Sequence, residues 1–555
     1  MNFRKIIGLA LIIISALLML EYHLGRLPVG SDIARQYVAA RQLANGHGLV
    51  FPLLNPEDLS KPILRLRTEF PPGLSVLMAP LFLVFDDVRF IHTIFGIANL
   101  LLFLFLSYTL LTVLARPPDI YKYLPLILFF LAINGRFAFS SASTDMINVN
   151  LSLLCGLFLL KYYQTQRQSV FLALACLMLV LCVYFRYAYF PALLVLPVFF
   201  MVRILLYKQK EMKELLVSIL YLAFFALPFL SHILYNNSKT EYIAKVSGDN
   251  SQQFYLENLV QANPFPMEAF FNLIPVLKIL GITSEFGHDR GYMYSNWLHF
   301  SFYFVSLIIL IPAGIYFYNV LKQRKLNNPD FVFGWFSVIL TCGIILLIAV
   351  GSVLNPSQHP AYNWSWAKVA RYYIFPIFLI QLSYFLILIN SRTKLLRIFV
   401  WAVLIGSISF SSVLKIYNYS KNYRFFDFEH NMETHSENAA HLNWYNLHKA
   451  LPSTAPEFKV LFIDHIISHR LFMESTHTGL NDATVVMVPE SATLTEMMDN
   501  LNTSRPVEAY FITESNESNP GFLQNENSAQ KFIDLPHDLT VYKFQLLPDG
   551  PTQSN

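Results

Sequence analysis

Long apolar stretches separated by short polar ones fill the first three quarters of the chain. After a first run at 6–20, runs long enough or nearly long enough to cross a bilayer as helices occupy 90–114, 122–139, 146–162, 168–185, 188–206, 213–233, 298–321, 331–354, 371–390 and 395–416. The pattern predicts a mostly α polytopic membrane protein with about 11 transmembrane helices.

One further apolar run, at 73–85, does not fit this series. It follows two prolines and is only about thirteen residues long, which favours an interfacial or re-entrant helix over a crossing. Upstream, residues 30–46 predict a short helix that Ser31 or Asp32 caps and an Asn-Gly pair ends. Residues 21–89 are therefore expected to form a long first outer loop that carries interfacial helices.

The positions of the cations set the orientation of the chain. Clusters occur in every second loop, at Arg116/Lys122, Lys161/Arg167, Lys208/Lys210/Lys213, Lys322/Arg324/Lys325 and Arg392/Lys394/Arg397. Because basic loops stay in the cytoplasm, the alternate loops and everything after residue 417 are predicted to lie outside. The expected location is the inner (plasma) membrane, with an extracytoplasmic C-terminal domain.

The pattern changes after residue 417, where polar segments alternate with short apolar ones. Strands are predicted at 458–464, 483–488, 507–513 and 539–546, and helices at 465–473 and 492–501. We therefore divide the chain into a transmembrane domain at 1–416 and a soluble α/β accessory domain at 417–555.

Composition supports this division and excludes other classes. The chain is 55% hydrophobic and 14% charged, which makes it more apolar than soluble domains are. Its net charge is only +4, and its lysines and arginines cluster beside the apolar runs, so the charge indicates membrane orientation and not nucleic-acid binding. The four cysteines all lie within apolar runs, where we interpret them as small packing residues. The bilayer is the one partner that composition alone predicts.

Two acids on the predicted outer side are the first candidates for chemistry. Asp32 begins the 30–46 helix and Asp145 follows Ser140–Thr144 at the start of another, so a helix cap explains each of them without any function. If the two carboxylates meet, they could share a divalent metal with His288, or one of them could act as a general base. Their spacing in sequence does not decide whether they meet.

Four basic or ionisable residues accompany these acids on the same predicted side. Arg186 lies between two apolar runs, where it could snorkel or pair structurally, or could bind a phosphate. His288, Arg290 and Arg371 lie in outer loops or at a helix mouth and together would form a cationic rim. Aromatic residues around them read first as an interfacial belt and second as sugar-stacking surfaces.

Three motifs in this architecture resemble a known family. They are Asp32-x(4)-Tyr37-x(2)-Ala40, the segment Glu69-Phe70-Pro71-Pro72-Gly73, and a second outer acid at Asp145. Over residues 1–420 the chain resembles the type-C (GT-C fold) integral membrane glycosyltransferases, and within them the bacterial branch related to protein O-mannosyltransferases and aminoarabinose-lipid A transferases. It departs from the family where Phe70 stands in place of the lysine of aminoarabinose transferases and where Asp145 is single instead of part of an Asp-x-Asp.

The resemblance implies a polyprenyl-phosphate-linked sugar donor and an extracytoplasmic acceptor, which could be a lipid, a glycan or a protein. Asp32, Glu69 and Asp145 would be the family's acids, with Asp32 deprotonating or orienting the acceptor hydroxyl in an inverting displacement. Donor-phosphate binding by Arg186, Arg290 and Arg371 has no motif behind it and rests on charge alone. The resemblance implies no certain cofactor, and a divalent metal stays one hypothesis.

A transporter or flippase of a lipid-linked saccharide is the alternative. It would use the same cationic vestibule without chemistry, and it should show paired broken helices or repeated halves, neither of which is visible in the sequence. Polymerases or ligases of lipid-linked saccharides are a third class.

Overall fold

The computed structural model describes the chain in blocks that fall into two compact units. The described residues are 31–53, 63–66, 70–85, 88–114, 143–240, 296–322, 326–353, 374–390, 393–419, 459–463, 483–487, 507–514, 530–535 and 539–546, with the single positions 10, 13 and 430. One unit, called the helical unit below, comprises Met1–His23 and Phe95–Lys421; the other, called the mixed unit, comprises Leu24–Ile94 and Asn422–Asn555. The domain boundary predicted after residue 416 stays a prediction.

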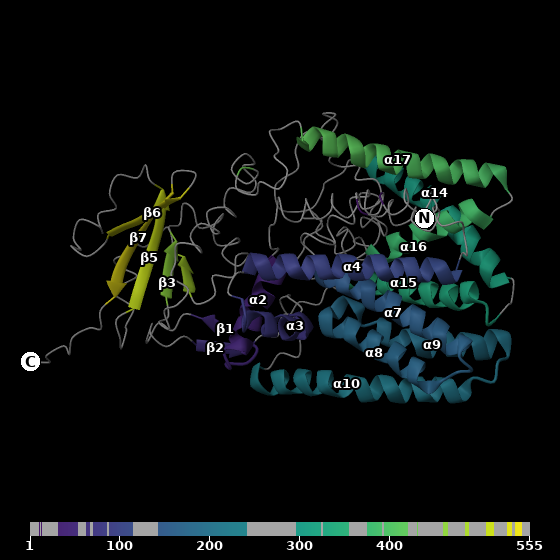
Figure 1. Cartoon of the computed structure of the whole chain (residues 1–555), viewed down its shortest axis with the longest axis horizontal. Helices are drawn as coiled ribbons and strands as arrows, with labels where there is room; N and C mark the ends of the chain where they lie inside the picture. The colour runs from purple at the N-terminus through teal and green to yellow at the C-terminus, as the bar shows by residue number, and fades with distance from the viewer. Residues whose placement is uncertain are drawn as a thin grey trace, which may run out of the picture. The chain divides into compact units, whose positions relative to one another are not determined.

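Long helices make up the described part of the helical unit (Figure 1). They are α4 (Val88–Leu114), which starts in the mixed unit, α7 (Ser143–Gln164), α8 (Ser169–Phe185), α9 (Ala192–Tyr207), α10 (Met212–Thr240), α14 (Asn296–Lys322), α15 (Pro329–Val353), α16 (Ile374–Asn390) and α17 (Lys394–Tyr419). Each coincides with one of the predicted crossings. The predicted crossing at 122–139 lies outside the described residues, and so does the one at 6–20 apart from the helical positions 10 and 13.

The surface of these helices is suited to lipid. Five of them contain segments long and apolar enough to cross a membrane, at Phe90–Leu114, Thr144–Gln164, Tyr187–Tyr207, Met212–Tyr235 and Pro329–Leu347. Along α10, large apolar side chains are exposed in a row at helical spacing: Leu216, Leu220, Phe224, Leu227 and Leu234. A soluble protein rarely exposes such a row, so the chain is a multi-pass membrane protein, as the sequence predicts.

Helix α7 lies at the centre of the helical unit and α10 at its edge. Within the apolar windows of these helices, 72% of α7 is buried but only 17% of α10. A glycine permits the close approach of α15 to α7, because a Cβ at Gly156 would lie 2.9 Å from the Phe333 ring. Three of the cysteines are buried as predicted, but Cys342 is exposed, so the packing interpretation is wrong there.

The first outer loop contributes the described N-terminal part of the mixed unit. Helix α2 (Ser31–Ala44) ends before Gly46, whose φ of +83° allows the chain to turn, and α3 (Gly73–Phe82) is only 10 residues long. The hydroxyl of Ser75 on α3 donates to the carbonyl of Gln36 on α2 at 2.9 Å. Both short helices match the prediction, whereas the hairpin of β1 (Val50–Leu53) and β2 (Ile63–Leu66) was not predicted, because four residues are too few to show a period.

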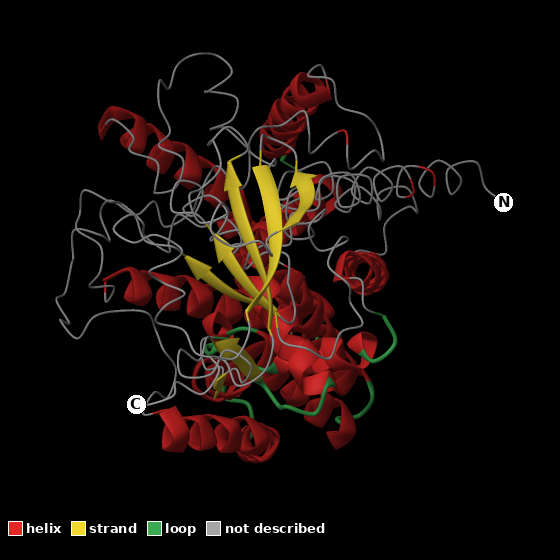
Figure 2. Ribbon diagram, turned by 90° about the vertical axis from the view of Figure 1, so that its left-hand side faces the viewer, coloured by secondary structure: helices red, strands yellow, loops and turns green. Residues whose placement is uncertain are grey.

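A five-stranded mixed sheet forms the described C-terminal part of this unit (Figure 2). Its order is β4 (Ala483–Met487), β3 (Lys459–Ile463), β5 (Val507–Glu514), β7 (Leu539–Leu546) and β6 (Gln530–Leu535). The first three strands are parallel, as expected of an α/β pattern, and β7 and β6 join antiparallel. Four strands confirm the predicted ones and β6 was missed; the helices predicted at 465–473 and 492–501 lie outside the described residues.

Candidate functional site

Helix α7 carries an unusual number of polar side chains for a buried membrane helix. Thr144, Asp145, Asn148, Asn150 and Ser152 are at most 3% exposed, although α7 is long enough to span a bilayer. Buried ionisable and polar groups in a membrane segment are energetically costly and mark functional sites. The first two turns of α7 are therefore the strongest candidate within the described part of the chain.

An ion pair joins the start of α7 to the end of α8. The Nε atom of Arg186 lies 2.9 Å from Oδ1 of Asp145, with the aspartate side chain 0% and the arginine side chain 13% exposed. A second guanidinium nitrogen, Nη1, donates to the hydroxyl of Thr144 at 3.1 Å. Arg186 is thus held by two successive residues of α7, and the structural pairing weighed in the sequence analysis is present.

The backbone places Arg186 at a break between two helices. It has extended dihedral angles, φ −158° and ψ 124°, between α8 and a 3-10 turn, η2 (Tyr187–Tyr189), that leads into α9. Its N–H still donates to the carbonyl of Cys182 at 3.0 Å, and its carbonyl accepts from the N–H of Tyr189 at 3.0 Å. Both main-chain groups are therefore satisfied, so the interruption of the apolar run leaves no buried N–H or C=O unpaired at this residue.

The α8-facing side of α7 continues this polar site toward the helix interior. The thiol of Cys182 on α8 lies 3.9 Å from both the carbonyl of Asn148 and the hydroxyl of Ser152. Since residues three and four apart share a helix face, Asp145, Asn148 and Ser152 form one stripe directed at α8. Asn150 points elsewhere and donates to the carbonyl of Asn99 on α4 at 3.0 Å.

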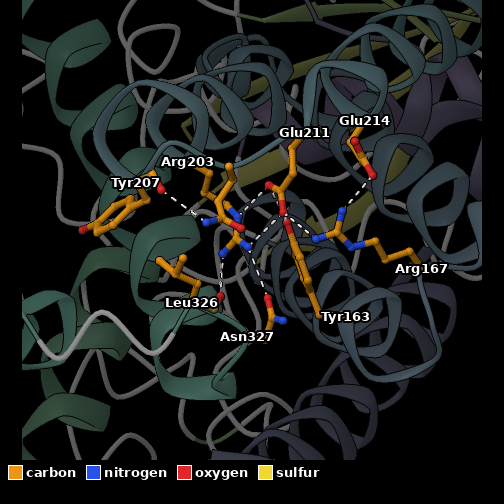
Figure 3. Close-up of polar contacts among 9 residues, drawn as sticks. Tyr163, Arg167, Arg203, Tyr207, Glu211, Glu214, Leu326 and Asn327 are labelled. Carbon is orange, nitrogen blue, oxygen red and sulfur yellow. Dashed lines mark hydrogen bonds and ion pairs between the residues drawn. The ribbon is translucent and has the colours of Figure 1, made fainter.

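A second buried charge cluster lies at the opposite end of α7 (Figure 3). Arg203, which is 0% exposed, donates to Glu211 through Nε at 2.7 Å and through Nη2 at 2.9 Å. The same carboxylate accepts from Arg167 at 2.9 Å and from the Tyr163 hydroxyl at 3.2 Å. Arg203 also donates to the carbonyl of Leu326 at 2.5 Å, which ties three loops together.

The loops that meet in this second cluster are ones that the cation pattern predicts on the same side of the membrane. The ion pairs between them were not predicted from the sequence. The residues of the cluster lie in the loops after α7, after α9 and before α15 or in the helix ends beside them, which the cation pattern places on one side. Burial is the largest single influence on the pKa of Arg167 and lowers it, but Glu211 and Glu214 together more than offset this, so the pKa of Arg167 lies above its usual value. A single arginine inside the 188–206 run, Arg203, was the sequence signal that could have revealed it.

The other predicted site residues are placed only in part. The backbone of Asp32 lies in the first turn of α2, in the mixed unit, and its side chain lies outside what the structure describes. Glu69, His288, Arg290 and Arg371 lie outside the described residues. Of the predicted set, the structure therefore brings Asp145 and Arg186 together, and the meeting of Asp32 with Asp145 stays a prediction.

The metal hypothesis finds no support in the residues that can be inspected. Among the described residues there is no group of three or more His, Cys, Asp or Glu side chains that could hold an ion. Asp145, one of the predicted ligands, already has the Arg186 guanidinium on its Oδ1 atom, and a metal would have to displace this cation. The side chains of Asp32 and His288, the other two predicted ligands, lie outside the described residues, so the metal stays a hypothesis.

No protein-family model and no curated protein sequence matches the chain. Among solved structures, ArnT from Cupriavidus metallidurans bound to undecaprenyl phosphate is similar at a TM-score of 0.49 and 10% identity, over 97% of each chain. The Archaeoglobus fulgidus oligosaccharyltransferase in complex with Zn and sulfate is similar at a TM-score of 0.44 and 12% identity, over 90% of this chain and 67% of that one. AglB from the same organism, with an inhibitory peptide and a dolichol-phosphate, gives 0.43 and 12%, over 92% and 70%.

These similar structures are membrane glycosyltransferases of the GT-C fold, the class that the sequence motifs resemble. Every TM-score is below 0.5 and every identity is near a tenth, so the likeness does not decide what this chain does.

Proposed function

We propose that the protein is a membrane glycosyltransferase that moves a sugar from a polyprenyl-phosphate donor to an extracytoplasmic acceptor. The observation that carries the proposal is the buried pair of Asp145 and Arg186 at one end of a central membrane helix. A donor of this class has an apolar tail and an anionic phosphate, which suits an arginine at the mouth of an apolar helix array. Undecaprenyl phosphate and dolichol-phosphate, the ligands of the similar structures, belong to the same class.

Charge balance suggests how the two residues work. Asp145 offsets the charge of Arg186 and, with Thr144, fixes the orientation of its guanidinium before any substrate binds. A phosphate that joins this neutral pair adds negative charge and needs further cations, the role proposed for Arg290 and Arg371. Arg186 would then bind the phosphate, and Asp145 would position Arg186.

The proposed reaction is a single displacement. The acceptor hydroxyl oxygen attacks the anomeric carbon, the bond from that carbon to the phosphate oxygen breaks, and its electron pair leaves with the polyprenyl phosphate. The hydroxyl proton passes to a base, which we assign to Asp32, with Glu69 as the further acid of the site. Attack from the face opposite the leaving group inverts the anomeric carbon, and cations stabilise the charge that develops on the phosphate.

The first test replaces the proposed base. Asp32→Asn in the full-length protein, reconstituted in nanodiscs with sugar-loaded undecaprenyl phosphate and a membrane extract as acceptor, is expected to abolish sugar transfer. A wild-type level of transfer by this variant would remove Asp32 from the mechanism. Asp534→Asn is the matched control, because Asp534 lies on the exposed β6 strand with its carboxylate on Lys531 and should leave transfer unchanged.

The proposed location follows from the cation pattern. We place the protein in the inner (plasma) membrane, with the basic loop ends in the cytoplasm and the C-terminal sheet outside. Labelling of a single cysteine introduced after residue 546 by a membrane-impermeant reagent in intact spheroplasts should succeed. Labelling only after permeabilisation would reverse the orientation and exclude an extracytoplasmic acceptor.

A further inference from the structure

Two buried polar side chains beside the Asp145–Arg186 pair have no hydrogen-bond partner within the part of the chain that the structure describes. Asn148 is 0% exposed, and neither its amide oxygen nor its amide nitrogen has a hydrogen-bond partner among the described residues. Tyr189 is 1% exposed, and its hydroxyl is in the same situation. A buried polar group without a partner costs about 1–3 kcal/mol, so a protein keeps such groups together for a reason.

Both side chains border the candidate site. Asn148 lies three residues after Asp145 on the α8-facing stripe, and its carbonyl contacts Cys182 at 3.9 Å. Tyr189 closes the turn that begins at Arg186, because its N–H donates to the carbonyl of Arg186 at 3.0 Å. Both residues therefore lie near the ion pair in the chain, and they come from two different elements, α7 and η2.

The chemistry of these groups selects a ligand. An amide offers two donors and an acceptor, and a phenol offers one donor and acceptor capacity. Together they complement neighbouring hydroxyl groups, each of which also donates and accepts. They complement a phosphate poorly, because the amide oxygen would face another acceptor, and an apolar polyprenyl tail would leave them unsatisfied.

We propose that Asn148 and Tyr189 bind hydroxyl groups of the sugar carried by the donor and so determine which sugar is accepted. The inference rests on the proposed function and assigns a sugar subsite to these two residues of α7 and η2, next to the phosphate subsite at Arg186. Discrimination of this kind is strong, because a sugar lacking the matching hydroxyl leaves the buried groups unpaired.

The experiment separates the sugar from the lipid phosphate. Full-length wild type, Tyr189→Phe and Asn148→Leu are reconstituted in nanodiscs, and their binding of undecaprenyl phosphate is compared with that of undecaprenyl phosphate carrying a hexose, a pentose or an amino-pentose. For the sugar that the wild type prefers, each variant should bind the loaded lipid about five- to tenfold more weakly. Binding of bare undecaprenyl phosphate should not change.

Other results overturn the inference in distinguishable ways. If both variants bind the preferred loaded lipid as the wild type does, the two groups are satisfied by water and the sugar subsite is wrong, while the proposed function stands. If a variant loses bare and loaded lipid equally, it acts on the phosphate or the fold and the subsite is again wrong. If the wild type binds no loaded lipid better than bare undecaprenyl phosphate, and transfers no sugar, the proposed function fails together with the inference.

The stability of the unliganded protein supplies an independent readout. Tyr189→Phe removes a hydroxyl that has no described partner, so its melting temperature without ligand should equal or exceed that of the wild type. Tyr163→Phe is the matched control, because it removes a part-buried hydroxyl that donates to Glu211 at 3.2 Å at the other end of α7. It should lower the melting temperature and leave the preference for loaded lipid intact; a lower melting temperature for Tyr189→Phe would show a structural hydroxyl and overturn the subsite.

Discussion

The two ends of α7 contain buried arginine–carboxylate pairs of opposite character. At the Glu211 end, the carboxylate receives four hydrogen bonds from three residues, Arg203, Arg167 and Tyr163, and the arginine reaches on to a third loop. At the Asp145 end, Arg186 lies 2.9 Å from Asp145, and the neighbouring side chains of Asn148 and Tyr189 have no hydrogen-bond partner among the described residues. A buried network in which every polar group has a hydrogen-bond partner stabilises the fold. A network with polar groups that have no described partner is instead suited to binding a ligand.

The comparison also explains why charge alone does not identify a site. The side chain of Arg203 is 0% exposed and that of Arg186 is 13% exposed, so burial alone would make Arg203 the stronger candidate for a functional residue. It is nevertheless surrounded by partners within the chain, including the Tyr163 ring 4.6 Å from its guanidinium carbon. Whether the polar groups beside a buried charge have partners among the described residues is therefore a better guide to function than burial.

The largest effect on stability is expected at the Glu211 end. Glu211→Ala leaves Arg203 buried without its counter-ion, and breaking such a pair costs about 3–5 kcal/mol. Denaturation by SDS in mixed micelles should show this loss in the free energy of unfolding. The double variant Arg203→Met/Glu211→Leu should recover part of it; a double variant as unstable as the single one would mean that the loops, not the unpaired charge, set the cost.

A smaller effect on stability and a larger one on activity are expected at the Asp145 end. Asp145→Asn keeps a similar shape and an acceptor for Arg186, whose side chain retains some access to solvent, so the free energy of unfolding should fall by about 1–3 kcal/mol. Sugar transfer should fall at least about tenfold, because the guanidinium loses the charge that orients it. Glu211→Ala should show the opposite pattern, with a larger loss in the free energy of unfolding and a smaller loss of sugar transfer than Asp145→Asn. If the two variants lost stability and activity in the same proportion, the two ends of α7 would not differ in function.

The sequence predicts the helices of this molecule better than its contacts. Apolar runs bounded by charged loops are local signals, so segments such as 146–162 and 213–233 could be read without the structure. The pairing of Asp145 with Arg186 joins residues 41 positions apart through the packing of α7 on α8, and no local pattern encodes it. The pairing of Arg203 is local, because its partner Glu211 lies in the next loop. It was not predicted, because Arg203 lies within the long apolar run at 188–206, which indicates only a membrane helix.

The smallest effect is expected where the Glu211 network reaches solvent. The side chain of Arg167 is 36% exposed and lies 2.9 Å from both Glu211 and Glu214, so water screens its ion pairs. Arg167→Ala should lower the free energy of unfolding by less than about 1 kcal/mol, since Arg203 still pairs with Glu211. This loss should become smaller at high salt, because ions screen exposed pairs. The stability contributed by the buried Arg203–Glu211 pair should not change, because ions do not reach it. A loss as large as that of Glu211→Ala would show that Arg167, rather than Arg203, is the charge on which this end of α7 depends.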